Sequence, residues 1–111
     1  MTHIEVYDAV IKNHGYSYRS LSLENGMPEN YIYKRIHTRE EGLITKVYCA
    51  NLALMGAGLI AVRGDEVRSL DELFANENER NGTRLYICRT LLEWGGWRLC
   101  VKDGEDLYYL T

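Results

Sequence analysis

The sequence predicts an α+β fold in which four helices come first and a small antiparallel sheet follows. Two observations lead to this prediction. In the first half of the chain, apolar residues recur at the spacing of amphipathic helices, whereas the second half contains β-branched and aromatic runs separated by glycine turns. A length of 111 residues, with 46% of them hydrophobic, is enough for one hydrophobic core.

The first two helices are predicted from their terminal residues. Thr2 and Glu5 have the spacing of a capping box, and the apolar repeat that follows should end at Gly15. Ser17 is a candidate N-cap for a second, shorter helix, which should end where Gly26 allows the chain to reverse.

The third and fourth helices are predicted from proline and from apolar spacing. Pro28 suits the first turn of a helix, and Ile32 and Ile36 share the face that we expect to be buried. Residues 43–55 predict a fourth helix with a wide apolar face, on which the other three helices should pack. The central stripe of this face comprises Leu43, Val47, Ala50 and Leu54, with Ile44, Tyr48 and Met55 beside it.

Beyond the fourth helix the pattern changes to strands and turns. An extended run with a Gly-Asp turn, GLIAVRGDEV, is followed by an acidic linker that contains a short helix. Three strands are predicted at 83–94, 97–103 and 107–111, with a Gly-Gly turn joining the first two as a hairpin. The predicted cross-strand pairs of this hairpin are Trp94 with Trp97, Leu92 with Leu99, Thr90 with Val101, and Leu91 with Cys100.

The predicted sheet has apolar residues on both faces, so its second face needs a cover. That cover is either the helical half or another subunit. The residues expected at a dimer or partner interface on this face are Leu91, Cys100, Leu107 and Tyr109. We therefore divide the chain into a helical domain, 1–64, and a C-terminal part, 65–111, that mediates dimerisation or partner binding.

The net charge of −3 is unevenly distributed. Between Lys12 and Lys46 six basic residues stand against four acidic ones, whereas between Asp65 and Arg80 six acidic residues stand against two arginines. A local cationic face on the helical half is therefore compatible with an acidic chain. No apolar run reaches the roughly 20 residues of a membrane span, and no signal-peptide pattern opens the chain, so we expect a cytoplasmic protein without a membrane partner.

The sequence contains no recognisable catalytic or metal-binding pattern. Cys49, Cys88 and Cys100 are widely separated without a CxxC pair, which favours reduced core residues over a disulfide framework or a zinc site. The histidines have no HxxxH or HxxE neighbours, and neither a phosphate-binding glycine loop nor a nucleophile elbow occurs. We therefore expect a protein that is not an enzyme and needs no cofactor.

The stretch around Gly26 has a distinctive pattern. Its features are Leu21 and small Ser22 before the glycine, apolar Met27 after it, Tyr31 and Ile32 in the next helix, and the later ending ANLALMGAGLIAV. This pattern resembles the Xre family of helix-turn-helix regulators, the Cro and repressor type common in phages and bacteria. The resemblance covers residues 3–63 and implies a four-helix helix-turn-helix bundle. Two positions depart from the family pattern: Pro28 replaces the usual Ser or Thr, and Ile36 is the second inward residue where the family more often uses position 35.

The resemblance implies that the third helix reads DNA in the major groove. Its exposed arc would carry groups able to contact base edges. Those residues are Glu29, Asn30, Tyr33 and Lys34, with Pro28 added by the family pattern and His37 by its expected exposure. The residues expected at phosphates are Ser17, Tyr18, Arg19, Thr38 and Arg39. The alternative interpretation of this mixed-charge helix face is that it is simply solvated.

We expect a sequence-specific, double-stranded DNA-binding transcriptional regulator, and among regulators a repressor, that binds a two-fold-symmetric operator as a homodimer. Its setting would be the cytoplasm of a bacterial cell or infected host. The alternative is a phage-type protein inhibitor, similar to an anti-CRISPR, whose C-terminal sheet grips a host protein while the helix-turn-helix domain is autoregulatory. The salt dependence of binding distinguishes the two interpretations, because only phosphate contacts release counterions.

Overall fold

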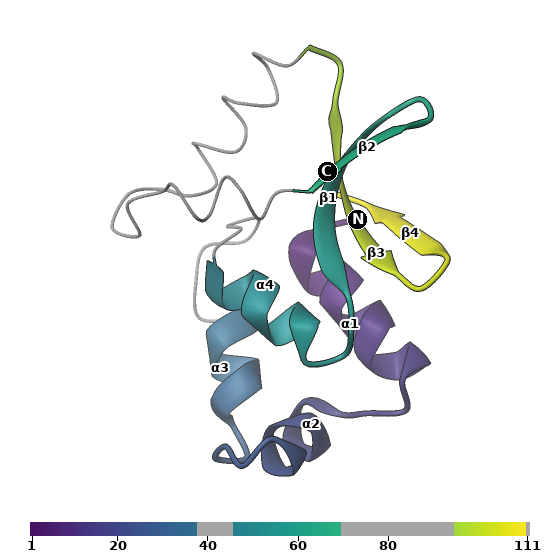
Figure 1. Ribbon diagram of the computed structural model, residues 1–111. Helices are drawn as coiled ribbons and strands as arrows, with labels where there is room; N and C mark the ends of the chain where they lie inside the picture. The colour runs from purple at the N-terminus through teal and green to yellow at the C-terminus, as the bar shows by residue number, and fades with distance from the viewer. Residues whose placement is uncertain (38–45, 70–94, 111) are drawn as a thin grey trace.

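The structure, a computed structural model, describes residues 1–37, 46–69 and 95–110. Figure 1 shows helices first and strands after them along the chain. The helices are α1 (His3–Asn13), α2 (Tyr18–Glu24), α3 (Tyr31–His37) and α4 (Lys46–Ala53). The strands are β1 (Gly58–Arg63), β2 (Glu66–Ser69), β3 (Arg98–Asp103) and β4 (Asp106–Tyr109). This order confirms the predicted α+β class.

α1 begins and ends where the sequence predicts. The Thr2 N–H donates to Glu5 Oε1 at 3.0 Å, and the Glu5 N–H donates to Thr2 Oγ1 at 3.2 Å, which completes the capping box. At the other end, the Tyr16 N–H donates to the Ile11 carbonyl at 3.0 Å around Gly15, whose φ is 72°. In the described ranges, none of the helices combines the length and apolar character needed to cross a membrane.

The strands form one antiparallel sheet in the order β2-β1-β3-β4. Two-residue turns join β1 to β2 and β3 to β4, each beginning with a glycine at positive φ, Gly64 at 59° and Gly104 at 61°. β1 pairs with β3, so that Leu59 lies opposite Val101. The extended run at 58–67 therefore enters the same sheet as the C-terminal strands, which the sequence did not predict.

The predicted hairpin between 83–94 and β3 is wrong in its strand pairing. β3 is bonded to β1 along one edge and to β4 along the other, so that Val101 lies between Leu59 and Tyr108. The expected partner segment lies outside the described residues, but neither edge of β3 is left for it. A glycine pair predicts a chain reversal but does not select the neighbouring strand, because pairing depends on burial across the whole sheet.

The C-terminal hairpin has the predicted assignment of faces. Val101 lies opposite Tyr108, and Cys100 lies opposite Tyr109, so these two pairs occupy opposite sides of the sheet. We call the side turned away from the helices the outer face. Its apolar residues in the described strands are Ile60, Val62, Val67, Cys100, Leu107 and Tyr109.

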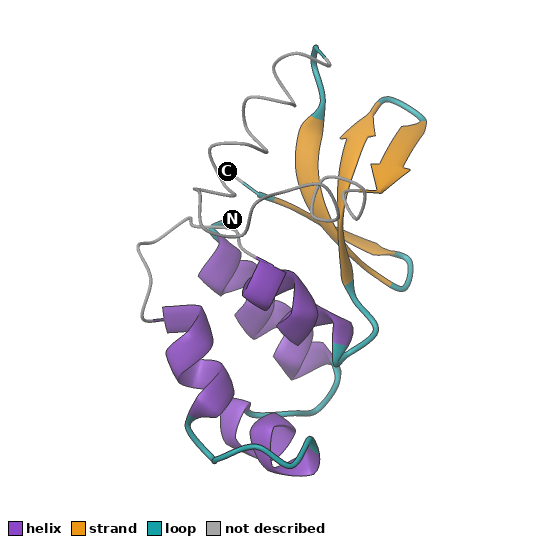
Figure 2. Ribbon diagram, turned by 60° about the vertical axis from the view of Figure 1, so that its left-hand side comes forward, coloured by secondary structure: helices purple, strands orange, loops and turns teal. Residues whose placement is uncertain are grey.

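One cluster of buried side chains joins the helices to the inner side of the sheet, and Figure 2 shows these two layers. Its fully buried members include Val10 of α1, Ile32 of α3, Leu52 of α4 and Val101 of β3. Full burial of an aliphatic side chain of this kind contributes roughly 1.5 to 3 kcal/mol. The core therefore contains residues from both sides of the predicted boundary at 64.

Two tyrosine hydroxyls bond α1 and α4 to each other. Tyr7 of α1 donates to the Asn51 carbonyl at 3.0 Å, and Tyr48 of α4 donates to the His3 carbonyl at 2.6 Å. Burial raises the pKa of both hydroxyls well above the ordinary value for tyrosine. The neutral hydroxyls thus fix the position of α4 on α1.

α4 is rotated relative to the predicted stripe. Tyr48 and Met55, which were predicted beside the stripe, are buried together with Asn51 and Leu52. By contrast, Ala50 is exposed and Leu54 is half-buried, while Leu43 lies outside the described residues. The rotation follows from the two tyrosine hydrogen bonds, which draw Tyr48 and the Asn51 carbonyl toward α1.

A polar contact links the end of α1 to β3. His14 Nε2 lies 2.9 Å from Asp103 Oδ1 and 3.0 Å from Oδ2, and the aspartate is buried. The N-terminal ammonium group of Met1 donates to the Tyr109 carbonyl at 3.2 Å, so the start of α1 also touches β4. Both ends of α1 are therefore held against the sheet.

Candidate nucleic-acid interface

α2 begins at the predicted N-cap, Ser17, which is part of a reciprocal cap with Ser20, and it ends at the predicted glycine turn. The Ser20 N–H donates to Ser17 Oγ at 3.0 Å, and the Ser17 N–H donates to Ser20 Oγ at 2.8 Å. The chain then reverses at Gly26, where a φ of 71° favours glycine over any residue with a Cβ. α2 is accordingly short, with seven residues.

Ser22 fixes the distance between α2 and α3. Its side chain is fully buried, and its hydroxyl donates to the Tyr18 carbonyl at 2.8 Å and accepts from the Ile32 N–H at 3.2 Å. The Met27 N–H donates to the Ser22 carbonyl at 2.9 Å. A larger side chain would push α3 away from α2, so this small residue lets the two helices and their turn behave as one unit.

α3 begins later than predicted, at Tyr31 instead of in the turn that contains Pro28. The Lys34 N–H donates to the Asn30 carbonyl at 3.0 Å, which makes Asn30 the N-cap. Pro28 lies in the preceding turn, where its carbonyl accepts from the Tyr31 N–H at 2.9 Å. The sequence contained the correct signal, because asparagine is a favoured N-cap residue.

α3 is buried along one side and exposed along the other, as the sequence predicts. Ile32 and Ile36 are fully buried. The predicted base-contact residues Glu29, Asn30, Tyr33 and Lys34 are all exposed. Two of them stand in the turn that leads into α3, and the other two lie on the helix itself.

The predicted phosphate contacts on α2 already have partners within the chain. Ser17 uses its hydroxyl in the cap, and the Tyr18 hydroxyl donates to a carboxylate on α1. Arg19 Nε lies 3.1 Å from Glu29 Oε2, with 72% and 54% of the two side chains exposed. An ion pair this exposed is worth at most about 1 kcal/mol and is readily exchanged for a phosphate. The other two predicted phosphate contacts, Thr38 and Arg39, lie outside the described residues.

An aromatic cluster on α2 and α3 is the feature that the sequence interpretation missed. Tyr33 and His37 stack with ring centroids 4.2 Å apart and planes at 13°. Tyr18 stands edge-on to both rings and is stacked on Tyr7 of α1 at 5.7 Å. Burial, and then the hydrogen bond to Asp8, raises the pKa of the Tyr18 hydroxyl. The available signal was the four-residue spacing of Tyr33 and His37, which places their side chains together on a helix.

Basic residues gather near the C-terminal end of α3. Its last turn contains Lys34, Arg35 and His37. The positive charges of Lys34 and Arg35 at this end complement the helix dipole. The Arg35 guanidinium also lies 5.2 Å from the centre of the Tyr31 ring. Together with Arg19 on α2, these side chains give the α2–α3 surface the local basic character that the charge distribution permits.

The predicted dimer or partner residues on the outer face differ in exposure. Cys100 is 0% exposed in the single chain, whereas Leu107 is 43% exposed. Tyr109 is half-buried, with the Arg98 guanidinium 4.1 Å from its ring centre. Leu91 lies outside the described residues. Cys100 is therefore buried within a single chain and cannot contact a partner.

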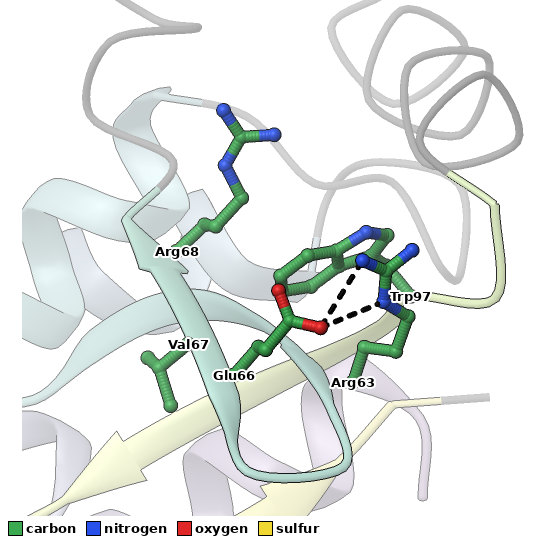
Figure 3. Close-up of a pocket in the computed structure, with 5 residues that line it drawn as sticks. All are labelled: Arg63, Glu66, Val67, Arg68 and Trp97. Carbon is green, nitrogen blue, oxygen red and sulfur yellow. Dashed lines mark hydrogen bonds and ion pairs between the residues drawn. The ribbon is translucent and has the colours of Figure 1, made fainter.

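A second surface feature is an open pocket beside the β1–β2 turn, shown in Figure 3. The Arg63 guanidinium lies 4.7 Å from the centre of the Trp97 ring and donates to Glu66 Oε1 at 3.1 and 3.3 Å. Arg63 also donates to the Gly95 carbonyl at 3.0 Å. These contacts link the residues before β3 to the β1–β2 turn. The Arg63 guanidinium in this pocket therefore stabilises the fold.

Comparisons of the chain with protein-family models, curated proteins and solved structures returned no match. The resemblance to Xre regulators therefore stays a prediction that rests on residues 3–63 themselves. In the part of the chain that the structure describes, no group of three His, Cys, Asp or Glu side chains is placed to bind a metal ion. The geometry of α2 and α3 is thus the basis for a functional proposal.

Proposed function

We propose that the chain is a sequence-specific, double-stranded DNA-binding protein of the helix-turn-helix type, and that it acts as a transcriptional repressor. In this proposal the four helices form a helix-turn-helix bundle in which α2 and α3 are the paired helices. One observation supports it above the others. α3 is fully buried along the side of Ile32 and Ile36, is fixed to α2 through Ser22, and leaves Tyr33 and Lys34 exposed on its other side.

Asn30 and Lys34 are the residues to which we assign base contacts. Asn30 stands at the N-terminal end of α3, which is the end that recognition helices insert into the major groove. The amide of asparagine suits adenine, and the ammonium group of lysine suits guanine. Because the Lys34 N–H donates to the Asn30 carbonyl, Lys34 lies one helical turn beyond Asn30.

Glu29 and Arg19 would exchange partners when DNA binds. Their ion pair is exposed, so separating it costs little, and Arg19 then becomes available to a phosphate. A carboxylate close to phosphates is unfavourable unless it accepts a hydrogen bond from a cytosine amino group. Glu29 therefore contributes specificity by rejecting sites that lack a cytosine at its position.

A two-fold-symmetric operator requires a homodimer, which we assign to the outer face of the sheet. The full chain is needed to test this assignment, because deletion from residue 81 onward would remove β3 and with it Val101 from the core. Leu107→Asp places a charge on an exposed apolar position and should weaken dimerisation in sedimentation equilibrium. Leu23→Asp, at an exposed position on α2, is the matched control.

The proposal is tested by selecting bound duplexes from random DNA with the full chain. We expect one enriched, two-fold-symmetric sequence, bound roughly a thousandfold or more tightly than a scrambled duplex. The affinity for both duplexes should fall steeply as salt rises, because phosphate contacts release counterions. If no sequence is enriched and no duplex binds at about 50 mM salt, the proposed function is wrong.

The second candidate is a phage-type protein inhibitor that grips a host protein with its sheet. Val67 and Leu107 favour it, because they are 59% and 43% exposed at opposite edges of the same outer face. Contacts made through apolar side chains depend little on salt, in contrast to phosphate contacts. Binding of a protein partner that persists at high salt and is lost in Leu107→Asp, with no selected DNA sequence, would favour this candidate.

A further inference from the structure

The exposed side of α3 contains one large aromatic ring among polar groups. Tyr33 is 51% exposed, yet its ring is held by two others. One face of the ring stacks on His37 at 4.2 Å, and Tyr18 approaches edge-on at 5.4 Å with an interplanar angle of 83°. Tyr18 is edge-on to His37 as well, at 5.3 Å. The three rings thus fix Tyr33 in one position while much of it remains open to a ligand.

A chain of hydrogen bonds extends behind these rings and fixes His37. The Tyr18 hydroxyl donates to Asp8 Oδ1, since an ionised carboxylate can only accept. The same hydroxyl oxygen can then accept from His37 Nε2, which lies 3.2 Å away. Nε2 must therefore be the nitrogen that carries a hydrogen. α1, α2 and α3 each contribute one residue to this support of Tyr33.

Base edges in the major groove present hydrogen-bonding groups and a single apolar group, the 5-methyl group of thymine. An exposed ring on a helix that enters the groove matches that methyl group. Tyr33 lies three residues beyond Asn30 and beside Lys34, so it is close to the residues that would contact neighbouring base pairs. Its fixed ring has little rotamer freedom left to lose on binding.

We infer, on the basis of the proposed DNA binding, that Tyr33 packs against the 5-methyl group of a thymine in the major groove and that His37 and Tyr18 position its ring. Tyr33 is then the residue that determines thymine specificity at one base pair of each half-site. Recognition uses the aromatic carbons and does not need the Tyr33 hydroxyl.

The inference is tested with the enriched duplex and the unmodified protein. Each thymine is replaced in turn by deoxyuridine, symmetrically in both half-sites, which removes only the methyl group. We expect one thymine position at which the replacement weakens binding about fourfold per half-site, the loss that follows from removing one buried methyl group. All other thymine positions should change affinity less than twofold.

Protein variants assign that loss to Tyr33. In Tyr33→Ala, the thymine and deoxyuridine duplexes should bind with equal affinity at this position, whereas Tyr33→Phe should keep the fourfold preference. His37→Ala should reduce the preference, and His37→Phe, which can still stack, should restore it. Thermal unfolding establishes that each variant is folded. The ratio of the two affinities reports positioning, because a general loss of stability would weaken both duplexes alike.

The outcomes separate this inference from the function on which it rests. If no duplex is enriched, the proposed function and the inference are both overturned. If a sequence is enriched but lacks an invariant thymine, or if Tyr33→Ala keeps the full preference for thymine, the inference alone is overturned. Sequence-specific binding by Asn30 and Lys34 would stand in that case.

Discussion

α3 and β3 both contribute fully buried residues to the core, but they differ in how many of their sides are buried. α3 buries Ile32 and Ile36 and exposes the opposite side of the helix. β3 buries Val101 toward the helices and Cys100 on the outer face, both at 0% exposure. The centre of β3, which is buried on both sides, serves the fold, whereas a helix with an open side can also bind a partner. This difference is the reason for assigning recognition to α3 and not to the centre of β3.

The largest expected effect concerns the buried side of α3. Ile32→Ala should lower the free energy of unfolding by about 2 to 5 kcal/mol, through lost burial and the cavity that remains. Arg35→Ala is the matched control on the exposed side, where a cation–π contact is worth about 0.5 to 1 kcal/mol. Urea unfolding measures both. Equal losses in the two variants would mean that α3 is not buried on one side only.

The second prediction concerns the outer face of β3. Cys100→Ser should cost about 1 to 3 kcal/mol, because it exchanges a weakly polar thiol, which donates to the Val101 carbonyl at 3.6 Å, for a strongly polar hydroxyl in a fully buried position. Lys102→Ala lies on the same face but is exposed, so it should change stability by less than about 0.5 kcal/mol. If Cys100→Ser is as stable as the unmodified protein, the outer side of β3 is open at this position. That side would then be a candidate surface for partner binding.

A smaller effect, spread over alkaline pH, tests the tyrosines that hold α4 on α1. Folding raises the pKa of Tyr7 and Tyr48 above 10.0, so their contribution is complete below about pH 10 and is lost as the pH rises further. Each should add a slope of up to about 1.4 kcal/mol per pH unit to the fall in stability. Urea unfolding at pH values from about 9 to 11 measures the slope.

Tyr48→Phe is the control for this pH dependence. The variant loses one hydrogen bond, worth about 0.5 to 1.5 kcal/mol at neutral pH, but its stability should fall less steeply above pH 10. The Tyr7 contribution should remain. An unchanged slope in the variant would contradict the assignment of the alkaline loss to these buried hydroxyls.

The sequence predicts those parts of the fold whose signals lie within a few residues. The caps at Thr2 and Ser17 depend on neighbouring backbone groups, and the burial of Ile32 and Ile36 follows from spacing within one helix. The start of α3 also has a local signal, because Asn30 is its N-cap. The prediction instead placed Pro28 in the first turn of the helix. The sequence therefore predicted the exposed side of α3 correctly but placed its N-terminus too early.

Features that depend on distant contacts could not be predicted in the same way. The rotation of α4 is set by the bond between Tyr7 and the Asn51 carbonyl, 44 residues apart in sequence. The neighbour of β3 is β1, with Leu59 opposite Val101, because the inner side of both strands completes the helical core. The ring cluster around Tyr33 draws on three helices. No pattern within one segment contains the information that brings such groups together.

The most direct test of the central claim compares variants of α3 with a lysine variant of α1 on two duplexes, the enriched one and its scrambled form, at several salt concentrations. Asn30→Ala and Lys34→Ala should each lose about 1 to 3 kcal/mol of affinity on the enriched duplex and much less on the scrambled one. Lys12→Ala, an exposed lysine on α1, should leave the ratio of the two affinities unchanged. Equal losses on both duplexes in the α3 variants would mean that α3 holds DNA without reading it, and no loss in either variant would remove α3 from the interface altogether.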